Sequence, residues 1–304
     1  MPPVESACLG YLAPEGFVDV LRQELAGDAV REVHGRLVLV DGLERPVAWV
    51  ANVWRNPVRI PIRSIGDGAK KLRAIQRNWA LYSVAAHRRA ALIAEQLPAV
   101  SARPVMFGAP APKAPLGSWT LLDAETILAS PSCSNPFPNG EVRFVEDRKA
   151  PPSRAYLKLW ELFTLLEERP QPGTFCVDLG SSPGGWTWVL QSLGARVLSV
   201  DKAALDEGIA RLPGVEHRRV SAFALDPSSI GPVEWLFSDV VCYPARLLAL
   251  VRRWLEAKTV RRFVCTIKFQ GATDFATAQA FAAIPGSRLI HLHHNKHELT
   301  WIRL

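Results

Sequence analysis

The chain has 304 residues and a formal net charge of +7, with 36 Lys and Arg against 29 Asp and Glu. Hydrophobic residues make up 48% of it and charged residues 21%, which excludes intrinsic disorder for most of the chain and suits about two domains with sizeable cores. No stretch approaches 18 uninterrupted apolar residues, so a membrane span is not expected.

The N-terminus and the cysteines both favour a reducing cytoplasm. The first residues, Met1-Pro2-Pro3-Val4-Glu5, lack the basic start and apolar core of a secretory signal. The 5 cysteines form no CxxC pair and are odd in number, which argues against a zinc site or a disulfide framework. We therefore expect a cytoplasmic protein.

Residues 1–45 predict a small α/β unit. Residues 7–12 form a short apolar run typical of a strand, and Pro14-Glu15-Gly16 interrupts it. Helical spacing follows over residues 17–25, and residues 36–40 predict a second strand.

Positive charge is concentrated in residues 55–103. This segment holds ten basic residues against two acids, a local charge of +8, so the rest of the chain sums to −1 (+7 − 8). Because exposed helices normally mix the two signs, the near absence of carboxylates favours a patch that binds RNA phosphates over an ordinary solvated face. The basic residues are Arg55, Arg59, Arg63, Lys70, Lys71, Arg73, Arg77, Arg88, Arg89 and Arg103.

Part of this basic segment is predicted to be helical. Leu72, Ile75, Trp79, Tyr82 and Ala86 recur at steps of three and four, and most of the basic residues lie off that stripe. Trp79 and Tyr82 could stack on unpaired bases, but their helical spacing favours positions in the core.

The stretch from residue 104 to residue 152 is rich in Pro, Gly and Ser. Strand-like patterns occur at residues 119–122 and 142–145, and residues 130–140 predict a turn-dense loop. We expect a domain boundary near residue 150.

From Ser153 onward, strands and helices alternate, which predicts an α/β domain with a doubly wound, Rossmann-like parallel sheet. The last two strands are expected to pair antiparallel. The predicted strands cover residues 174–179, 196–200, 235–239, 262–267, 288–292 and 298–303, and the predicted helices cover residues 155–168, 186–193, 245–256 and 274–283.

The sharpest motif is the turn Asp178-Leu179-Gly180-Ser181-Ser182-Pro183-Gly184-Gly185-Trp186, between a buried strand and a helix. Gly180 lets the backbone pass close to a ligand, and Gly184 and Gly185 open a helix whose amides can face a carboxylate or phosphate. The motif is not G-x-G-x-x-G, and no Lys-Ser/Thr pair follows Gly185. Both departures weaken dinucleotide and P-loop interpretations.

A second carboxylate, Asp201, ends the next predicted strand, 23 residues after Asp178. An acid at this place in such sheets binds the hydroxyls of a ribose. S-adenosylmethionine suits the pair, with Asp178 and the glycines near its amino-acid moiety. The alternative is a strand–turn–helix junction whose glycines are incidental.

Together these features resemble the FtsJ-like RNA 2′-O-ribose methyltransferases over residues 153–304. The turn resembles the family's first motif, and the segments Ser153–Leu159, Ser238–Val241, Thr266–Lys268 and His297–Thr300 resemble its entry helix and later motifs. The resemblance implies a catalytic tetrad of Lys158, Asp239, Lys268 and Glu298. It also implies S-adenosylmethionine as the cofactor, bound by Asp178, Gly180, Ser181, Ser182, Pro183, Gly184, Gly185, Trp186, Asp201, Ser221 and Asp239.

The resemblance gives these residue types a chemical purpose. A ribose 2′-hydroxyl is a poor nucleophile at neutral pH and needs a base in line with the methyl group. We expect Lys268 to be that base, with Lys158 as a second cation that lowers its pKa and holds the hydroxyl. Asp239 and Glu298 would orient the ammonium groups, although their charge opposes that lowering.

The resemblance is closer to members that modify a cytidine of large-subunit ribosomal RNA, which carry a ferredoxin-like unit and then a THUMP RNA-binding domain. It implies a ferredoxin-like unit at residues 1–45, a THUMP-like basic region at 46–150 and the methyltransferase domain at 151–304. One departure concerns the adenine contact, because Ser221 stands where the family usually has an acid, and Asp226 is offset from that position.

The histidines of residues 291–297 could suggest a metal site. Alternation along a strand would put His291 and His293 on one face and His294 on the other, which is poor ligand geometry, so no metal is expected. Trp186 and Trp188 are expected to be packing groups.

These features predict a cytoplasmic S-adenosylmethionine-dependent RNA 2′-O-methyltransferase acting on 23S ribosomal RNA. A methyltransferase for another RNA or a small molecule is an alternative, but base-amine enzymes carry Asn/Asp-Pro-Pro-aromatic where this chain has Asp239-Val240-Val241-Cys242. A non-catalytic RNA-binding or ribosome-assembly factor is the other alternative. The predicted tetrad argues against it, and Ser221 mildly favours it.

Overall fold

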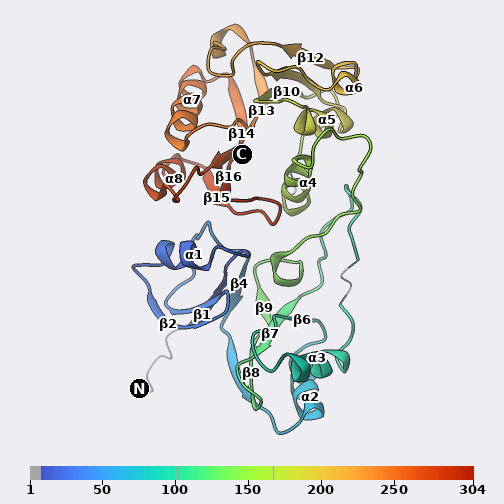
Figure 1. Ribbon diagram of the computed structural model, residues 1–304, viewed down its shortest axis with the longest axis vertical. Coiled ribbons are helices and arrows are strands. Elements are labelled where there is room, and N and C mark those ends of the chain that lie inside the picture. The colour runs from blue at the N-terminus through green and yellow to red at the C-terminus, as the bar shows by residue number, and fades with distance from the viewer. Residues whose placement is uncertain (1–7, 101–102, 167) are drawn as a thin grey trace. The chain divides into compact units, whose positions relative to one another are not determined.

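The computed structural model describes residues 8–100, 103–166 and 168–304. Its chain divides into two compact units, Met1–Phe144 and Val145–Leu304 (Figure 1). The residues on which the absence of a secretory signal was predicted, 1–5, lie outside the described part. Within that part, no helix is both long and apolar enough to cross a membrane.

The first unit begins with a five-stranded antiparallel sheet in the order β2-β3-β1-β4-β9. The expected strands and helix of residues 1–45 are present, but the sheet extends beyond residue 45, because β4 and β9 pair along its open edge. Its elements are β1 (Cys8–Leu12), α1 (Val18–Glu24), β2 (Ala29–His34), β3 (Leu37–Asp41), β4 (Asn52–Arg55) and β9 (Ser132–Cys133).

The same unit contains a four-stranded sheet in the order β5-β8-β7-β6, covered by two helices. An apolar core between the sheet and these helices includes Leu72, Ile93 and Trp119, all fully buried. The elements are β5 (Val58–Pro61), α2 (Ile65–Ile75), β6 (Trp79–Leu81), α3 (His87–Glu95), β7 (Gly117–Leu121), β8 (Thr126–Ser130) and the 3-10 turn η1 (Pro138–Gly140).

The helix predicted through residues 72–86 is wrong in its second half. Helix α2 ends at Ile75, and Trp79–Leu81 forms β6, which pairs in parallel with β7. The Trp79 indole Nε1–H donates to the carbonyl oxygen of Leu72 at 2.9 Å, so the side chain is buried although it is not helical. The strand predicted at residues 142–145 is also wrong, because Phe144 makes only an isolated bridge with Val105.

The second unit has the predicted Rossmann-like architecture, a seven-stranded sheet in the order β12-β11-β10-β13-β14-β16-β15. The first five strands in this order run parallel, and β16 runs antiparallel between β14 and β15. The predicted antiparallel pairing of the last two strands is thus confirmed. Its elements are α4 (Tyr156–Leu165), β10 (Phe175–Leu179), α5 (Gly185–Ser192), β11 (Arg196–Val200), α6 (Glu207–Ala210), β12 (Val215–Arg218), η2 (Pro227–Ser229), β13 (Val233–Ser238), α7 (Pro244–Ala257), β14 (Val260–Lys268), α8 (Phe275–Ala282), β15 (Ser287–Ile290) and β16 (Glu298–Arg303).

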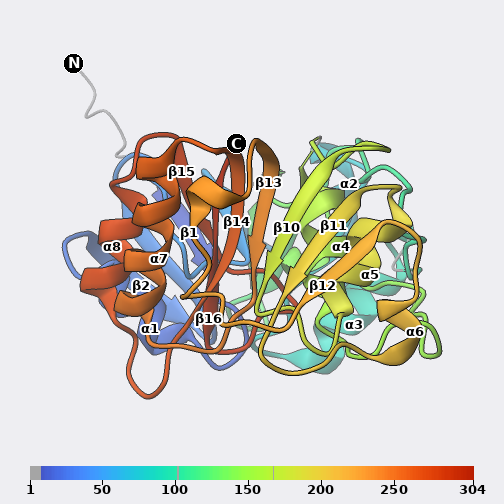
Figure 2. The same cartoon turned by 90° about the horizontal axis from the view of Figure 1, so that it is seen from above.

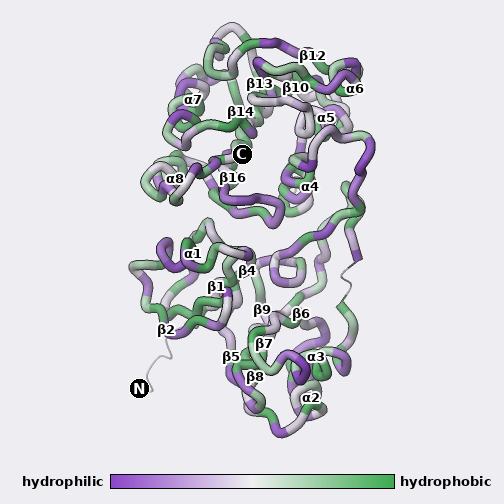
Figure 3. The backbone as a smooth tube through the Cα atoms, in the orientation of Figure 1, coloured by the Kyte–Doolittle hydropathy of each residue, from purple (hydrophilic) through white to green (hydrophobic). Residues whose placement is uncertain are grey.

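Helices cover both faces of this sheet. Helices α4 and α5 lie on one side and α7 and α8 on the other (Figures 1 and 2). The central strands β10, β13 and β14 are consequently buried along most of their length, which suits their mainly apolar sequences. In Figure 3 the tube is green along β14 and purple along the connection from β15 to β16.

Candidate active site

Four side chains of the predicted tetrad meet at one edge of the second unit's sheet. Asp239 directly follows β13, and Lys268 ends the parallel neighbour β14. Because β16 runs the other way, its first residue, Glu298, is the register partner of Lys268. The fourth member, Lys158, comes from helix α4. Ligands bind at this carboxyl edge in open α/β sheets, so the location suits a functional site.

The tetrad is connected by short ionic contacts. The ammonium Nζ of Lys158 lies 3.0 Å from Asp239 Oδ1 and 2.7 Å from Glu298 Oε1. The Nζ of Lys268 lies 3.1 Å from the same Asp239 oxygen and donates to the backbone carbonyl of Asp239 at 2.5 Å. Asp239 therefore bridges the two lysines, and two positive charges are matched by two negative charges.

The two lysines differ in their exposure and in what they contact. The side chain of Lys158 is 11% exposed and lies between two carboxylates. Burial pulls the pKa of Lys158 downward, but the Asp239 and Glu298 charges outweigh it, and the net pKa is raised. Lys158 therefore keeps its proton at neutral pH. Lys268, 19% exposed, also lines the adjacent cavity.

The glycine-rich turn packs too tightly for side chains at two positions. Gly180 has φ +75°, and a Cβ there would lie 2.7 Å from the Val240 backbone. Gly184 has φ +116° and packs against Ile209. The turn thus brings its backbone close to the loop after β13, the close approach for which glycine is required.

A cavity of about 370 Å³ opens between this turn and the tetrad. Its wall combines the turn with Lys268 and with the loop after β13, including Val240 and Val241. Of the residues predicted to bind cofactor, nine line it: Asp178, Gly180, Ser181, Ser182, Pro183, Gly185, Trp186, Asp201 and Asp239. Their binding roles stay predictions, but the fold brings them to one place.

The two spaced carboxylates have different environments. Asp201 Oδ2 accepts from the backbone N–H of Ser182 at 3.1 Å, so this acid also holds the turn. Asp178 is fully buried and accepts from the Thr187 hydroxyl at 2.7 Å. Burial raises the pKa of Asp178 to about 7, against the Thr187 hydrogen bond and with help from the nearby Asp239 and Asp201 charges.

Ser221 lies in a second cavity, of about 190 Å³, which shares Gly180, Asp201 and Val240 with the first. Phe223 also lines it, and the Arg246 guanidinium lies 3.9 Å from the centroid of that ring. Asp226, the offset acid, instead caps the 3-10 turn η2, where it accepts from Ser228 N–H.

Sequence reasoning missed Glu161, one helical turn after Lys158. This carboxylate is 2% exposed and accepts from the backbone N–H groups of His293 and His294, at 2.7 and 3.0 Å. His294 Nδ1 lies 2.7 Å from it as well. Helix α4 therefore fixes the connection that leads to Glu298. An acid within the apolar run Leu157–Phe163 is the signal that could have found it.

The remaining histidines and tryptophans contact protein groups. His291 lies 3.0 Å from the Lys296 carbonyl, and His297 lies 2.8 Å from the Thr273 hydroxyl. Residues 291–294 follow β15 rather than continue it, so the strand alternation expected for them is wrong. Among the described residues, no His/Cys/Asp/Glu group has metal-site geometry. Trp186 is 3% exposed and donates to the Ala155 carbonyl, and Trp188 packs near Trp160.

The basic segment lies in the first unit, and its members differ in their contacts. Arg55 pairs with Glu44 and Arg59 with Glu32, both acids outside the segment, while Lys71 pairs with Asp67. Within the described ranges, no ion pair is seen for the other basic residues. These are Arg63, Lys70, Arg73, Arg77, Arg88, Arg89 and Arg103, and all except Arg89 are exposed.

One match to a known family lies within the second unit. Residues 151–266 match the family model of the FtsJ-like methyltransferases. The chain is 38% identical over 172 residues to the ribosomal RNA large subunit methyltransferase M of Halorhodospira halophila, covering 54% of this chain and 50% of that protein. The protein of the same name from Methylococcus capsulatus is 39% identical over 142 residues, covering 45% and 40%. The chain spans about half the length of the curated relatives it matches.

The solved structures that align with this chain have lower sequence identity to it than the curated relatives. TrmN from Thermus thermophilus aligns over 97% of this chain and 98% of its own, with a TM-score of 0.39 and 14% identity. An rRNA methylase from Streptococcus thermophilus aligns over 43% and 86%, with a TM-score of 0.33 and 13% identity. These likenesses are too low to bear on function. By the family match, residues 151–266 of this chain are similar to the FtsJ-like methyltransferases.

Proposed function

We propose that this chain is a cytoplasmic, S-adenosylmethionine-dependent methyltransferase that modifies a ribose 2′-hydroxyl of an unpaired nucleotide in 23S ribosomal RNA. One observation carries the proposal. Asp239 and Lys268 belong both to the buried ionic tetrad and to the wall of the cavity beside the glycine-rich turn. A cofactor in that cavity would therefore lie against the charged groups that methyl transfer to a hydroxyl needs.

The cavity wall fits the proposed cofactor. Asp178 Oδ1 and Ser181 Oγ are buried polar atoms without a partner among the described residues, and both residues line the cavity. A cofactor with an ammonium and a carboxylate group would give such atoms partners. Asp201 would take the ribose hydroxyls, and the second cavity, with Ser221, would take the adenine.

The tetrad chemistry follows from the two lysine environments. S-adenosylmethionine supplies an electrophilic methyl group when bound. Lys158 keeps its proton, because its pKa is raised, and as a fixed cation it would hold the ribose hydroxyl and stabilise developing negative charge. Lys268, at the cavity wall, would act as a neutral amine and accept the hydroxyl proton as the O–CH₃ bond forms and the methyl–sulfur bond breaks. Asp239 would orient the Lys268 amine and the Lys158 ammonium group, and Glu298 would orient that of Lys158.

The first unit would bind the RNA. We infer that its five-stranded sheet is ferredoxin-like and that its second sheet with α2 and α3 is THUMP-like. The exposed cations of the basic segment, among them Arg73, Arg77 and Arg88, would contact phosphates. Support comes from their exposure and from the scarcity of carboxylates around them.

Methyl transfer from radiolabelled S-adenosylmethionine to ribosomal RNA tests the reaction. Lys268→Ala should lower the rate roughly 10²- to 10⁴-fold, the usual contribution of a general base. Lys149→Ala, which changes an exposed lysine outside the cavity of the same unit, should leave the rate unchanged. Equal incorporation by wild type and Lys268→Ala would contradict the mechanism.

Calorimetry separates the enzyme from the alternative assembly factor. Lys268→Ala should still bind S-adenosylmethionine, because the glycine-rich turn and Asp201 remain. A wild-type protein that binds ribosomal RNA but neither binds the cofactor nor transfers methyl groups would instead favour the non-catalytic function.

A further inference from the structure

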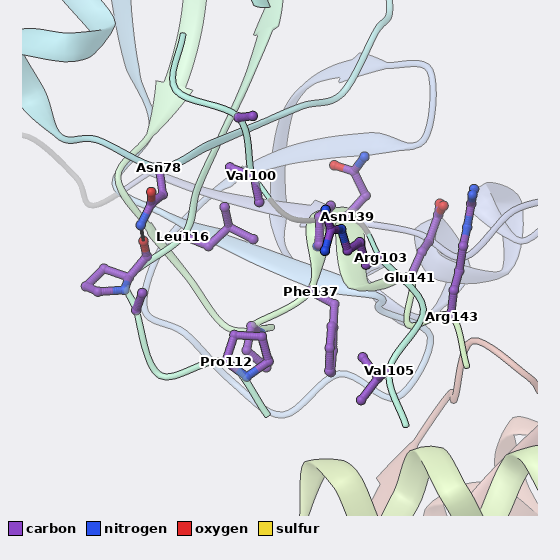
Figure 4. A pocket seen from close by; sticks show the side chains of 15 residues that line it. Asn78, Val100, Arg103, Val105, Pro112, Leu116, Phe137, Asn139, Glu141 and Arg143 are labelled. Atoms are coloured by element: carbon purple, nitrogen blue, oxygen red, sulfur yellow. Dashed lines mark hydrogen bonds between the residues drawn. The ribbon is translucent and has the colours of Figure 1, made fainter. Parts of the chain in front are cut away.

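The first unit contains a cavity of about 500 Å³ that has no part in the proposed chemistry. It lies between the start of β6, the irregular segment before β7 and the 3-10 turn η1 (Figure 4). All its lining residues belong to Met1–Phe144. Its volume is in the range of pockets that enclose small organic groups, roughly 300–1,000 Å³.

One part of the cavity wall is apolar and well ordered by packing. Phe137 is 5% exposed and Leu116 9% exposed, and both line the cavity. Four prolines add flat, rigid surface: Pro112, Pro115, Pro136 and Pro138. In Figure 4 the Phe137 ring stands between Pro112 and Val105. Such a wall suits a flat aromatic group.

The other part of the wall is cationic. Arg103 and Arg143 line the cavity, and Figure 4 shows both near Glu141, on one side of Phe137. Glu141 is already engaged, because its Oε1 lies 3.0 Å from Arg36 Nη2. Both cavity arginines are exposed, and no carboxylate partner is seen for them in the described ranges. The wall therefore carries charge that suits an anion.

Several backbone contacts hold the cavity wall in place without a ligand. The Asn78 side-chain amide donates to the Pro115 carbonyl at 3.2 Å, and the Asn78 backbone carbonyl accepts from Gly117 N–H at 3.0 Å. Val105 N–H donates to the Arg143 carbonyl at 2.7 Å. Two segments distant in the sequence are thus tied together at each end of the cavity, so little ordering is needed on binding.

We propose that this cavity binds one unpaired nucleotide of an RNA strand, its base against the proline-rich apolar wall over Phe137 and Leu116 and its flanking phosphates on Arg103 and Arg143. An apolar wall beside exposed guanidinium groups matches the two halves of a nucleotide, a flat base and an anionic phosphate. A base held in a duplex would have to leave its stack to enter the pocket, so the site selects single strands. The inference rests on the proposed function only for the choice of RNA.

Binding of a short, fluorescently labelled single-stranded RNA to the full chain, without cofactor, tests the site by anisotropy. Arg143→Glu should weaken binding roughly tenfold or more, because a charge-assisted phosphate contact becomes repulsive. Arg22→Glu makes the same charge change at an exposed position of α1 outside the cavity and should have at most about a twofold effect. Equal effects of the two substitutions would overturn the proposal.

A second pair of measurements tests the base. Phe137→Leu keeps an apolar wall but removes the ring beneath the prolines. Because only 5% of Phe137 is exposed, affinity should fall by roughly twofold to fivefold, less than the value of one fully stacked base. A strand with one abasic site should bind wild type more weakly than the intact strand. A 5-iodouridine strand should photocrosslink to the peptide that contains Phe137. Unchanged affinity for Phe137→Leu together with crosslinks only elsewhere would overturn the assignment.

Competition experiments distinguish a nucleotide within an RNA strand from a free mononucleotide as the ligand. Duplex RNA should compete poorly, and free adenosine or uridine monophosphate should compete only at far higher concentration than the strand. Displacement by free mononucleotide at equal concentration would overturn an RNA site in favour of a small-molecule site. Methyl transfer is read separately: loss of transfer in Lys268→Ala with normal strand binding supports both proposals, whereas strand binding without any transfer by wild type refutes only the proposed function.

Discussion

The two units place their cations in opposite environments. In Val145–Leu304 the tetrad lysine Lys158 is buried and Lys268 is partly buried, and their charge is matched by Asp239 and Glu298. In Met1–Phe144 most cations of the basic segment are exposed, and few face a carboxylate. Buried charges depend on their partners, whereas exposed charges act through a screened field.

Under the proposed function, this difference separates chemistry from docking. A neutral cluster such as the tetrad of two lysines and two carboxylates has fixed geometry and offsets its desolvation only through precise contacts. An exposed cationic surface gains binding energy through release of counterions from a polyanion. The same residue types should therefore respond very differently to substitution, and the predictions below test that difference.

The largest effect on stability is expected at Lys158. Lys158→Met removes the cation between Asp239 and Glu298. It leaves the buried Glu298 without its ion-pair partner and Asp239 with Lys268 alone, which should cost about 3–5 kcal/mol. Because the pKa of Lys158 is raised in the fold, its stabilisation is fully present below the ordinary lysine pKa of 10.5 and is lost only as the pH rises through the raised value. Denaturant unfolding at pH 7 measures it.

The matched control for Lys158 comes from the other unit. Arg88→Met removes an exposed cation from α3 and should change stability by no more than about 0.5 kcal/mol. The double variant Lys158→Met, Glu298→Gln should recover part of the loss, since one unpaired charge is removed. If Lys158→Met were as stable as Arg88→Met, the contrast between the two units would fail.

Asp178 tests what happens to a buried carboxylate without a cation. Its folded pKa of about 7 lies above the ordinary value of 3.8, so the folded state holds a proton that the unfolded state releases. The contribution of Asp178 to the free energy of unfolding is therefore fully present below pH 3.8 and is lost as the pH rises through 7. Each unit of pKa corresponds to about 1.4 kcal/mol, so the loss amounts to a few kcal/mol.

Asp178→Asn should remove this dependence, because the amide stays neutral and can still accept from Thr187. The stability of the variant relative to wild type should rise between pH 5 and pH 8, measured by denaturant unfolding. Asp206→Asn, at an exposed helix cap, is the control and should show no such rise. If the difference in unfolding free energy between Asp178→Asn and wild type were the same at pH 5 and pH 8, burial would not be the cause of the raised pKa.

Glu161 should affect rate more than cofactor affinity. Glu161→Gln weakens the charge-assisted bonds to His293 and His294, which should cost about 1.5–3 kcal/mol of stability. Displacement of the connection to Glu298 should lower the rate of methyl transfer roughly tenfold to a hundredfold. The affinity of Glu161→Gln for the cofactor, measured by calorimetry, should equal that of wild type, because Glu161 does not line the cavity. The exposed Glu256→Gln serves as control, and a matching rate loss there would refute a positioning role.

Local patterns made much of the second unit predictable. The turn at residues 178–186 combines a strand, glycines and a helix within one short segment. Six of the seven strands of the sheet appeared where alternation predicted them, whereas β12 was missed. Tetrad members at strand ends could be placed at one edge because parallel strands share their direction. The pairing of Lys268 with Glu298 was harder to predict from local patterns, because it is set by strand register between residues 30 positions apart.

Features that depend on distant segments were missed. Trp79 has helical spacing from Leu72, yet it lies in β6 because Gly117 and its neighbours offer a parallel partner strand. The sheet of the first unit takes β9 from a region predicted as a loop, where Ser132 and Cys133 pair with β4. Tertiary pairing overrides local propensity in both cases.

The smallest effect is expected in the exposed segment. Arg73→Ala, Arg77→Ala and Arg88→Ala together should flatten the dependence of log affinity on log salt by up to about 2, at roughly 0.7 per phosphate of a single strand. Filter binding of ribosomal RNA between 50 and 200 mM salt measures the slope. Arg169→Ala, Arg211→Ala and Arg288→Ala make the same charge change on the second unit and should leave the slope near the wild-type value. Equal slopes for the two triple variants would mean that net charge, rather than its concentration in residues 55–103, drives binding, and the docking function of the first unit would then have to be abandoned.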